Sequence, residues 1–193
     1  MGYALVSPPA SEPVELAEAK AHLRVTSSDE DDLITELIVA ARAICEMTTG
    51  RSLITQTWRA DFPCFPVSGE ALRLPHGPVQ SVTSIYYYDD TNADTLLASS
   101  VYKADLTEQL AKVRLAPDQY WPSVTRQSDA VRVTYEAGYG DDGIDVPRPI
   151  LQAMLLLIGE WFRNREASSE RVARELPFAV TSLLGRYIVR SQA

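Results

Sequence analysis

Apolar residues recur at helical spacing close to the start of the chain. Pro13 suits the first turn of a helix, because its missing N–H would have no acceptor there. The apolar residues that then share one face are Leu16, Ala19 and Leu23. This pattern predicts a short first helix.

A longer helical pattern follows. The acidic run at residues 29–32 would lie at the positive end of the helix macrodipole, and Gly50 is a typical C-terminal stop. Candidate N-caps are Thr26, Ser27 and Ser28. The apolar stripe comprises Leu33, Ile34, Leu37, Ile38, Ala40, Ala41, Ile44 and Cys45. A stripe this wide predicts contact with more than one neighbour, with Cys45 as a buried core residue.

Between residues 53 and 136 the pattern changes to the period of two that is typical of strands. Pro, Gly, Asn and Asp separate five runs: LITQTWRADF, EALRL, VQSVTSIYYYD, AKVRL and AVRVTYEA. In the third run Tyr87 would face the opposite side of its strand from Tyr86 and Tyr88. We predict a β-rich middle in which these tyrosines are packing residues.

Two helical patterns follow the strands. Residues 150–162 are strongly apolar, but a helix of this length spans only roughly 20 Å of the about 30 Å hydrocarbon core of a membrane. A buried helix is therefore predicted, not a membrane span. Pro177 would begin a last helix. Its apolar stripe, which needs a covering surface, is Val180, Leu183, Leu184, Tyr187 and Ile188.

Charge and cysteine content narrow the function classes. The chain carries 18 basic and 26 acidic residues, a formal net charge of −8, so it lacks the basic surface that tight nucleic-acid binding requires. Cys45 and Cys64 are too few and too isolated for a disulfide framework or a cysteine-rich zinc site. The first 13 residues lack the pattern of a signal peptide. We expect the protein to stay in a reducing compartment where it is made.

The stretch GYGDDG at residues 138–143 has the glycine spacing of a dinucleotide-binding loop. In such a loop the helix begins within the motif and directs free N–H groups at the phosphates. Here Pro147 and Pro149 delay the helix, and Asp141 and Asp142 would repel a phosphate. We interpret the stretch as an acidic turn that ends the β-rich middle.

Other catalytic and metal-binding patterns are weak. His22 and His76 stand alone, without a second histidine or a cysteine pair at ligand spacing. His22 is predicted to be solvated, and His76 is predicted to lie in a turn before Gly77. Two adjacent carboxylates, as at Asp89 and Asp90, make a weak cation site and are interpreted as a solvated loop. We therefore expect no catalysis, no cofactor and no bound metal.

The order of the segments along the chain resembles the order found in a known protein family. The chain reads PVELAEAKAHLRV, EMTTGRSLITQTW, LRLPHGPVQSVTSIYYYDD, VRVTYEAGYG, VPRPILQAMLLLIGEWFRNRE and LPFAVTSLLGRYIVR, in that order. Over residues 13–190 it resembles the head–tail connector, or adaptor, proteins of tailed bacteriophages and gene transfer agent particles. The resemblance implies an α+β fold in which N- and C-terminal helices (residues 1–52 and 141–193) form a core that carries residues 53–140 as a β-rich insertion.

The resemblance also implies a function. Such proteins form a twelvefold ring below the portal, between it and the stopper or tail-terminator protein, in the virion neck, after assembly in the host cytoplasm. Double-stranded DNA passes through without specific binding. The C-terminal segment docks on the portal, so the candidate portal-binding residues are Leu183, Leu184, Arg186, Tyr187, Ile188 and Arg190.

Two further expectations depend on surface chemistry. Asp141 and Asp142 are candidates for an acidic loop facing the DNA channel, where basic contacts would hold the genome. The alternative function is a carbohydrate-binding module in the β-rich middle, with a platform formed by Tyr86, Tyr87, Tyr88 and Trp121.

Overall fold

The computed structural model describes residues 2–67, 70–107, 110–125, 127–164 and 177–189. Helices make up 33% and strands 29%, which confirms the α+β class. The chain divides into two compact units. The β unit comprises Met1–Ala10 and Thr55–Tyr139, and the helical unit comprises Ser11–Ile54 and Gly140–Ala193.

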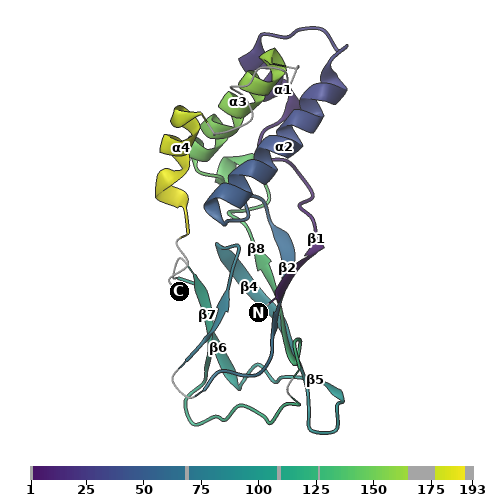
Figure 1. The fold of residues 1–193 in the computed structure, drawn as a ribbon, viewed down its shortest axis with the longest axis vertical. Coiled ribbons are helices and arrows are strands. Elements are labelled where there is room, and N and C mark those ends of the chain that lie inside the picture. The colour runs from purple at the N-terminus through teal and green to yellow at the C-terminus, as the bar shows by residue number, and fades with distance from the viewer. Residues whose placement is uncertain (1, 68–69, 108–109, 126, 165–176, 190–193) are drawn as a thin grey trace. The chain divides into compact units, whose positions relative to one another are not determined.

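The β unit contains two antiparallel sheets (Figure 1). The larger sheet has the order β1-β2-β8-β4-β5, with strands Gly2–Ser7, Gln56–Phe62, Val131–Ala137, Val79–Tyr88 and Asp94–Leu96. The smaller sheet has the order β3-β7-β6, with strands Leu72–Leu74, Ala111–Leu115 and Tyr102–Asp105. The printed strand pairings within the two sheets are antiparallel, and short turns join two of the pairs, β4 with β5 and β6 with β7.

The core of the β unit follows from residue alternation. Every second residue of β8 is buried, and the buried set is Val131, Val133, Tyr135 and Ala137. These side chains share one apolar cluster with residues of the smaller sheet, among them Leu72, Leu74 and Val113. The Tyr135 hydroxyl donates a hydrogen bond of 2.9 Å to the Pro75 carbonyl, so this buried polar group is satisfied.

Strand β1 was not predicted, because residues 1–52 were expected to belong to the helical core. Gly2–Ser7 instead pairs antiparallel with β2, with Tyr3 opposite Ala60. All six residues are exposed. An edge strand that buries neither face shows no apolar and polar alternation, which is the signal on which strand prediction relies.

The helical unit contains α1 (Leu16–Leu23), α2 (Asp31–Thr49), α3 (Arg148–Arg163) and α4 (Phe178–Leu184). Helix α3 packs against the other three (Figure 1). Its buried residues include Ile150, Met154, Leu157 and Ile158, and those of α2 include Ile34, Ile38, Ala41 and Cys45. Burial of Cys45 is confirmed, and burial raises the pKa of its thiol to about 12. Within the described part of the chain, no helix has the length and apolar character needed to cross a membrane.

Of the two predicted ends of α2, the C-terminal end is confirmed and the N-terminal end is wrong. Gly50 is the C-terminal stop, with φ at 68°, as the sequence indicated. The predicted N-caps Thr26, Ser27 and Ser28 are wrong, because the helix begins at Asp31 with Glu30 before it and no side-chain cap. The Ser27 hydroxyl instead donates to the Asp29 carboxylate over 2.6 Å, in a local turn that competes with capping.

Candidate interaction surfaces

The C-terminal segment of the helical unit contains five of the six predicted portal-binding residues. A single 3₁₀ turn, Gly185–Tyr187, continues α4. Leu184 is fully buried, whereas Leu183, Tyr187 and Ile188 are half-buried and Arg186 is exposed. Arg190 lies outside the described residues. The predicted stripe is therefore divided between two core positions, Val180 and Leu184, and a surface.

Contacts with the end of α2 fix the backbone of this segment. The Arg51 Nε donates a 2.7 Å hydrogen bond to the Tyr187 carbonyl, and the Val189 N–H donates one of 2.8 Å to the Thr49 carbonyl. The Arg186 guanidinium lies 5.5 Å from the centroid of the Tyr187 ring, within the range of a cation–π contact. The surface around Arg186 is thus presented on an ordered backbone.

Phe178 is a further residue of this surface, and it was not among the predicted portal-binding residues. Its side chain is 88% exposed, the highest fraction among the large hydrophobic side chains described. Phe178 and Ser182 are four residues apart on α4, so they lie on the same exposed face. The sequence signal for Phe178 was its apolar side chain directly after Pro177, at a position outside the predicted apolar stripe.

The acidic turn connects β8 to the helical unit's α3. Both Asp141 and Asp142 are exposed. The Ser11 hydroxyl donates a 2.7 Å hydrogen bond to the Asp141 carbonyl, and a 3₁₀ turn, Gly143–Asp145, follows. Helix α3 begins only at Arg148, after Pro147. The delayed helix start that argued against a phosphate site is confirmed for Pro147, whereas Pro149 lies in the first turn of α3 and does not delay it.

Position 143 requires glycine because the backbone of Pro13 passes close to it. A Cβ at this position would lie 2.0 Å from the carbonyl oxygen of Pro13, far inside van der Waals contact. Gly143→Ala is therefore expected to lower the free energy of unfolding of the helical unit by about 1–3 kcal/mol, as overpacking does. Urea unfolding followed by circular dichroism at 222 nm measures this. Gly185→Ala is the matched control, because no atom lies within 4 Å of the added Cβ; equal stability of the two variants would contradict the prediction.

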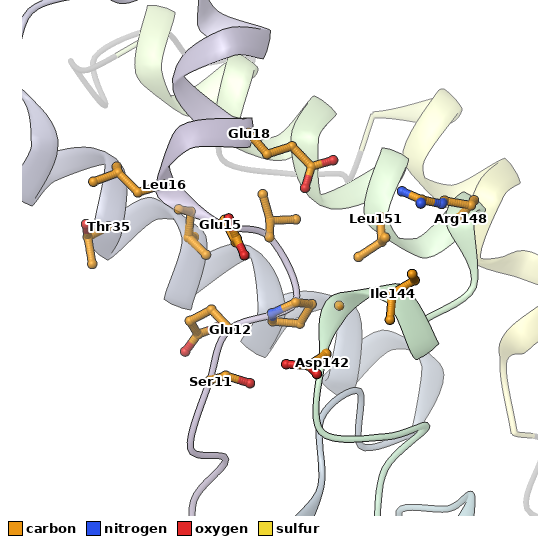
Figure 2. A pocket seen from close by; sticks show the side chains of 14 residues that line it. Ser11, Glu12, Glu15, Leu16, Glu18, Thr35, Asp142, Ile144, Arg148 and Leu151 are labelled. Carbon is orange, nitrogen blue, oxygen red and sulfur yellow. The ribbon is translucent and has the colours of Figure 1, made fainter.

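A groove of about 670 Å³ lies beside this turn, within the helical unit. Four of its lining residues are carboxylates, Glu12, Glu15, Glu18 and Asp142, and one is basic, Arg148. Figure 2 shows Glu15 and Glu18 on the α1 side and Asp142 and Ile144 on the opposite side. The apolar lining comprises Pro13, Val14, Leu16, Ile38, Ile144 and Leu151.

The groove carboxylates differ in their partners. Glu12 forms a bidentate pair with Arg42, at 2.8 and 3.2 Å, and Arg42 also donates to Glu46 over 3.0 Å. Glu15 and Glu18 are exposed. Among the residues that the structure describes, no three His, Cys, Asp or Glu side chains are grouped closely enough to hold a metal ion. The groove therefore offers an acidic, partly apolar surface.

The other candidate cation ligands, Asp89 and Asp90, lie in a loop, and Asp89 stabilises this loop by local hydrogen bonds. The Asp89 carboxylate accepts hydrogen bonds from the Thr91 hydroxyl and from the N–H groups of Thr91 and Ala93, at 2.6 to 3.0 Å. These bonds, chiefly that from the Thr91 hydroxyl, lower the pKa of Asp89. Asp90 is exposed. The loop interpretation accounts for both residues.

His76 lies in the predicted turn, with φ at 59°, and it also packs between aromatic rings. Its ring stacks on Trp58 at 4.0 Å and meets the edge of Tyr3 at 4.7 Å. The Nε2 atom is buried without a hydrogen-bond partner, and burial lowers the pKa of His76. His22 is exposed, as predicted.

Acidification should destabilise the β unit through His76. Because the pKa of His76 is lowered in the folded state, the unfolded chain binds its proton first, and stability falls as the pH falls below the unfolded pKa of about 6.5. We expect the melting temperature to fall between pH 7.5 and pH 5.5, and His76→Asn to flatten this dependence. Asparagine tolerates the positive φ. Parallel pH profiles of the two proteins in calorimetry would contradict the prediction.

The proposed carbohydrate platform does not form. Tyr86 and Tyr88 lie on the face of β4 opposite the core, and the Arg132 guanidinium covers Tyr88 at 4.5 Å from its ring centroid. Tyr87 and Trp121 pack against the core cluster, where Trp121 stacks on Phe65 at 4.7 Å. The four rings therefore do not share a surface, and the alternative function loses its structural basis.

Comparisons with known proteins give consistent matches. The family described as phage gp6-like head–tail connector protein matches residues 13–110. A search of curated proteins finds no match. Among solved structures, a chain in the neck of an empty gene transfer agent (GTA) particle, computed with C6 symmetry, matches with a TM-score of 0.81 at 23% identity, covering 98% of this chain and 97% of that one.

Two further structures match with the same identity and coverage. A chain in the virion of a native GTA particle gives a TM-score of 0.78, and a chain in the neck of a native GTA particle, computed with C12 symmetry, gives 0.77. At this identity the three structures establish a shared fold over nearly the whole length of the chain.

Proposed function

This chain belongs to the family of phage gp6-like head–tail connector proteins, and from that membership we propose that it is a structural subunit of the neck of a phage or GTA particle. The family match over residues 13–110 is the observation that carries the proposal. The family consists of connectors and not of enzymes, and the shared fold is that of chains in GTA necks and virions. The protein would act in the virion neck after assembly in the host bacterial cytoplasm.

Twelve copies of the subunit would form a closed ring between the portal and the stopper or tail-terminator protein. One of the matched necks was computed with C12 symmetry and another with C6 symmetry, and both symmetries are compatible with twelve copies in those particles. A ring needs heterologous contacts that close. Helix α2 supplies a candidate surface with the exposed residues Val39, Ala40, Ala43 and Met47.

The helical unit would form the core of the subunit and carry the portal contact. Leu184 belongs to the interior of that unit, so it would support the contact from within. The surface offered to the portal comprises the exposed Phe178 and Arg186 with the half-buried Leu183, Tyr187 and Ile188. An apolar anchor beside a guanidinium is a combination common at binding hot spots.

The ring would give the genome a conduit without holding it. Twelve copies of net charge −8 would carry a formal charge of −96 (12 × −8). Exposed carboxylates such as Asp141 and Asp142, if turned to the lumen, would repel phosphates and avoid the counterion release that produces tight DNA binding. Double-stranded DNA would pass without specific contacts.

Deletion of the gene tests the proposed role. A subunit between portal and tail is dispensable for packaging heads but needed for joining them to tails, so the deletion strain should produce DNA-filled heads and separate tails in electron micrographs. Expression of the intact chain in trans should restore joined particles. Normal tailed particles from the deletion strain would refute the proposal.

A further inference from the structure

Backbone contacts hold together the walls of the groove between α1, α2 and the acidic turn. The walls come from segments 130 residues apart, and the hydrogen bond of 2.7 Å from the Ser11 hydroxyl to the Asp141 carbonyl joins them. Gly143 lies so close to Pro13 that an added Cβ would be 2.0 Å from the Pro13 carbonyl oxygen. The opening of about 670 Å³ is therefore a defined feature of the helical unit alone.

The floor of the groove is apolar. Val14 is fully buried, Ile38 is 2% exposed and Leu151 is 3% exposed, so these three lining residues form the base of the opening. Ile144 lies on the Asp142 side and is 79% exposed (Figure 2). Covering an exposed isoleucine with another apolar side chain removes apolar surface from water, which is favourable. The groove is thus suited to an apolar occupant.

The rim of the groove is acidic. Glu15, Glu18 and Asp142 are exposed, and Figure 2 shows the two glutamates on one side of the groove and the aspartate on the other. Arg148 also lines the groove but offsets only part of this charge. Carboxylates on both sides of an apolar floor favour an occupant that carries positive charge as well as apolar side chains.

We infer that the groove binds an apolar segment that bears lysine or arginine and belongs to another protein of the neck. An apolar side chain of this segment would cover Ile144 and the floor, and its basic group would pair with the carboxylates of the rim. Arginine suits the rim because its guanidinium can donate two parallel hydrogen bonds to one carboxylate. This contact presupposes the proposed neck role.

Two other occupants fit the groove less well. DNA is anionic, so the carboxylates of the rim would repel its phosphates. A second copy of this chain carries a formal net charge of −8, and its exposed Arg186 is already proposed for the portal contact. A protein of different composition, with basic residues beside apolar ones, is the better match for this surface.

Photo-cross-linking in assembled particles identifies the occupant. Thr35 is exposed and lines the groove, so replacing it by the photoreactive amino acid benzoylphenylalanine places the reactive group beside whatever the groove binds. Irradiation of purified particles and mass spectrometry should give a product with another particle protein, linked through a peptide that has lysine or arginine beside apolar residues. The same replacement of Thr26, an exposed threonine outside the groove lining, is the matched control and should not give this product.

Two variants of the cross-linking chain test the chemistry of the contact. Glu15→Lys with Glu18→Lys reverses the charge of the rim and should lower the yield of the product, per incorporated chain, by about tenfold or more. Ile144→Ser removes an apolar wall at a 79% exposed position, so it should lower the yield by about fivefold or more while circular dichroism shows an intact fold. Asp90→Lys with Glu136→Lys makes the same change of charge at exposed positions of the β unit and should leave the yield unchanged.

The possible outcomes separate this contact from the neck role. Particles that contain the chain but give no product with another protein at position 35, or a product with a second copy, overturn the contact and leave the neck role intact. A linked peptide without basic residues, or an unchanged yield from either groove variant, overturns the contact as well. Absence of the unaltered chain from purified particles, measured by mass spectrometry, removes the proposed function and the contact with it.

Discussion

Replacing Phe178 by aspartate and Arg186 by glutamate is expected to weaken attachment to the portal by about 30-fold or more while the chain stays folded. Both side chains are exposed, with Phe178 at 88%, so neither contributes to the core of the helical unit. The change removes an apolar anchor and reverses a charge at the centre of the proposed contact. Sedimentation of the purified chain with its portal protein measures the loss.

The matched control changes exposed residues of the same unit. Asp29→Asn with Ala21→Ser alters two exposed positions outside the α4 segment and should leave attachment unchanged. Full attachment of the Phe178/Arg186 variant would show that α4 is not the docking surface. This design is sharper than removal of the segment, because truncation after Phe178 would also remove the buried Val180 and Leu184.

Leu184→Ala is expected to lower the free energy of unfolding of the helical unit by about 2–5 kcal/mol. The Leu184 side chain is fully buried, and α4 packs on α3, so the substitution leaves a cavity in the core. Thermal and urea unfolding, monitored at 222 nm, measure the loss. Attachment to the portal should persist below the lowered melting temperature, because the surface residues remain.

Leu183→Ala is the neighbouring control, since Leu183 is only half-buried and its truncation should cost less. If Leu184→Ala lowers the free energy of unfolding no more than Leu183→Ala does, the assignment of Leu184 to the core and of Leu183 to the surface is wrong. Loss of attachment by Leu184→Ala with unchanged stability would place Leu184 in the portal contact, as the sequence alone had suggested.

The helices were predictable because their signals are local. Helical spacing, Gly50 and the prolines before α3 and α4 each act within one or two turns. Strand β1 was not predictable by alternation, because backbone pairing with β2 holds it and all its residues are exposed. The start of α2 was predicted wrongly because the Ser27 hydroxyl forms a hydrogen bond with the Asp29 carboxylate and not with an N–H group of the helix.

The interaction surfaces were predictable only in part. Periodicity identified the C-terminal stripe but could not show that Leu184 faces inward, because burial depends on α3, which precedes it in sequence by more than twenty residues. The acidic groove combines Glu15 and Glu18 with Asp142, and a hydrogen bond between residues 130 positions apart, Ser11 and Asp141, holds the two segments together. No local pattern in the sequence encodes that proximity.

Electron microscopy of the purified chain mixed with its portal protein tests the proposed function most directly. We expect an additional ring on the portal with twelvefold symmetry and with the α4 segment in contact with the portal. A folded chain and an intact portal that yield images of the portal alone, at concentrations that saturate any specific contact, would contradict the assignment of this protein as a head–tail connector subunit.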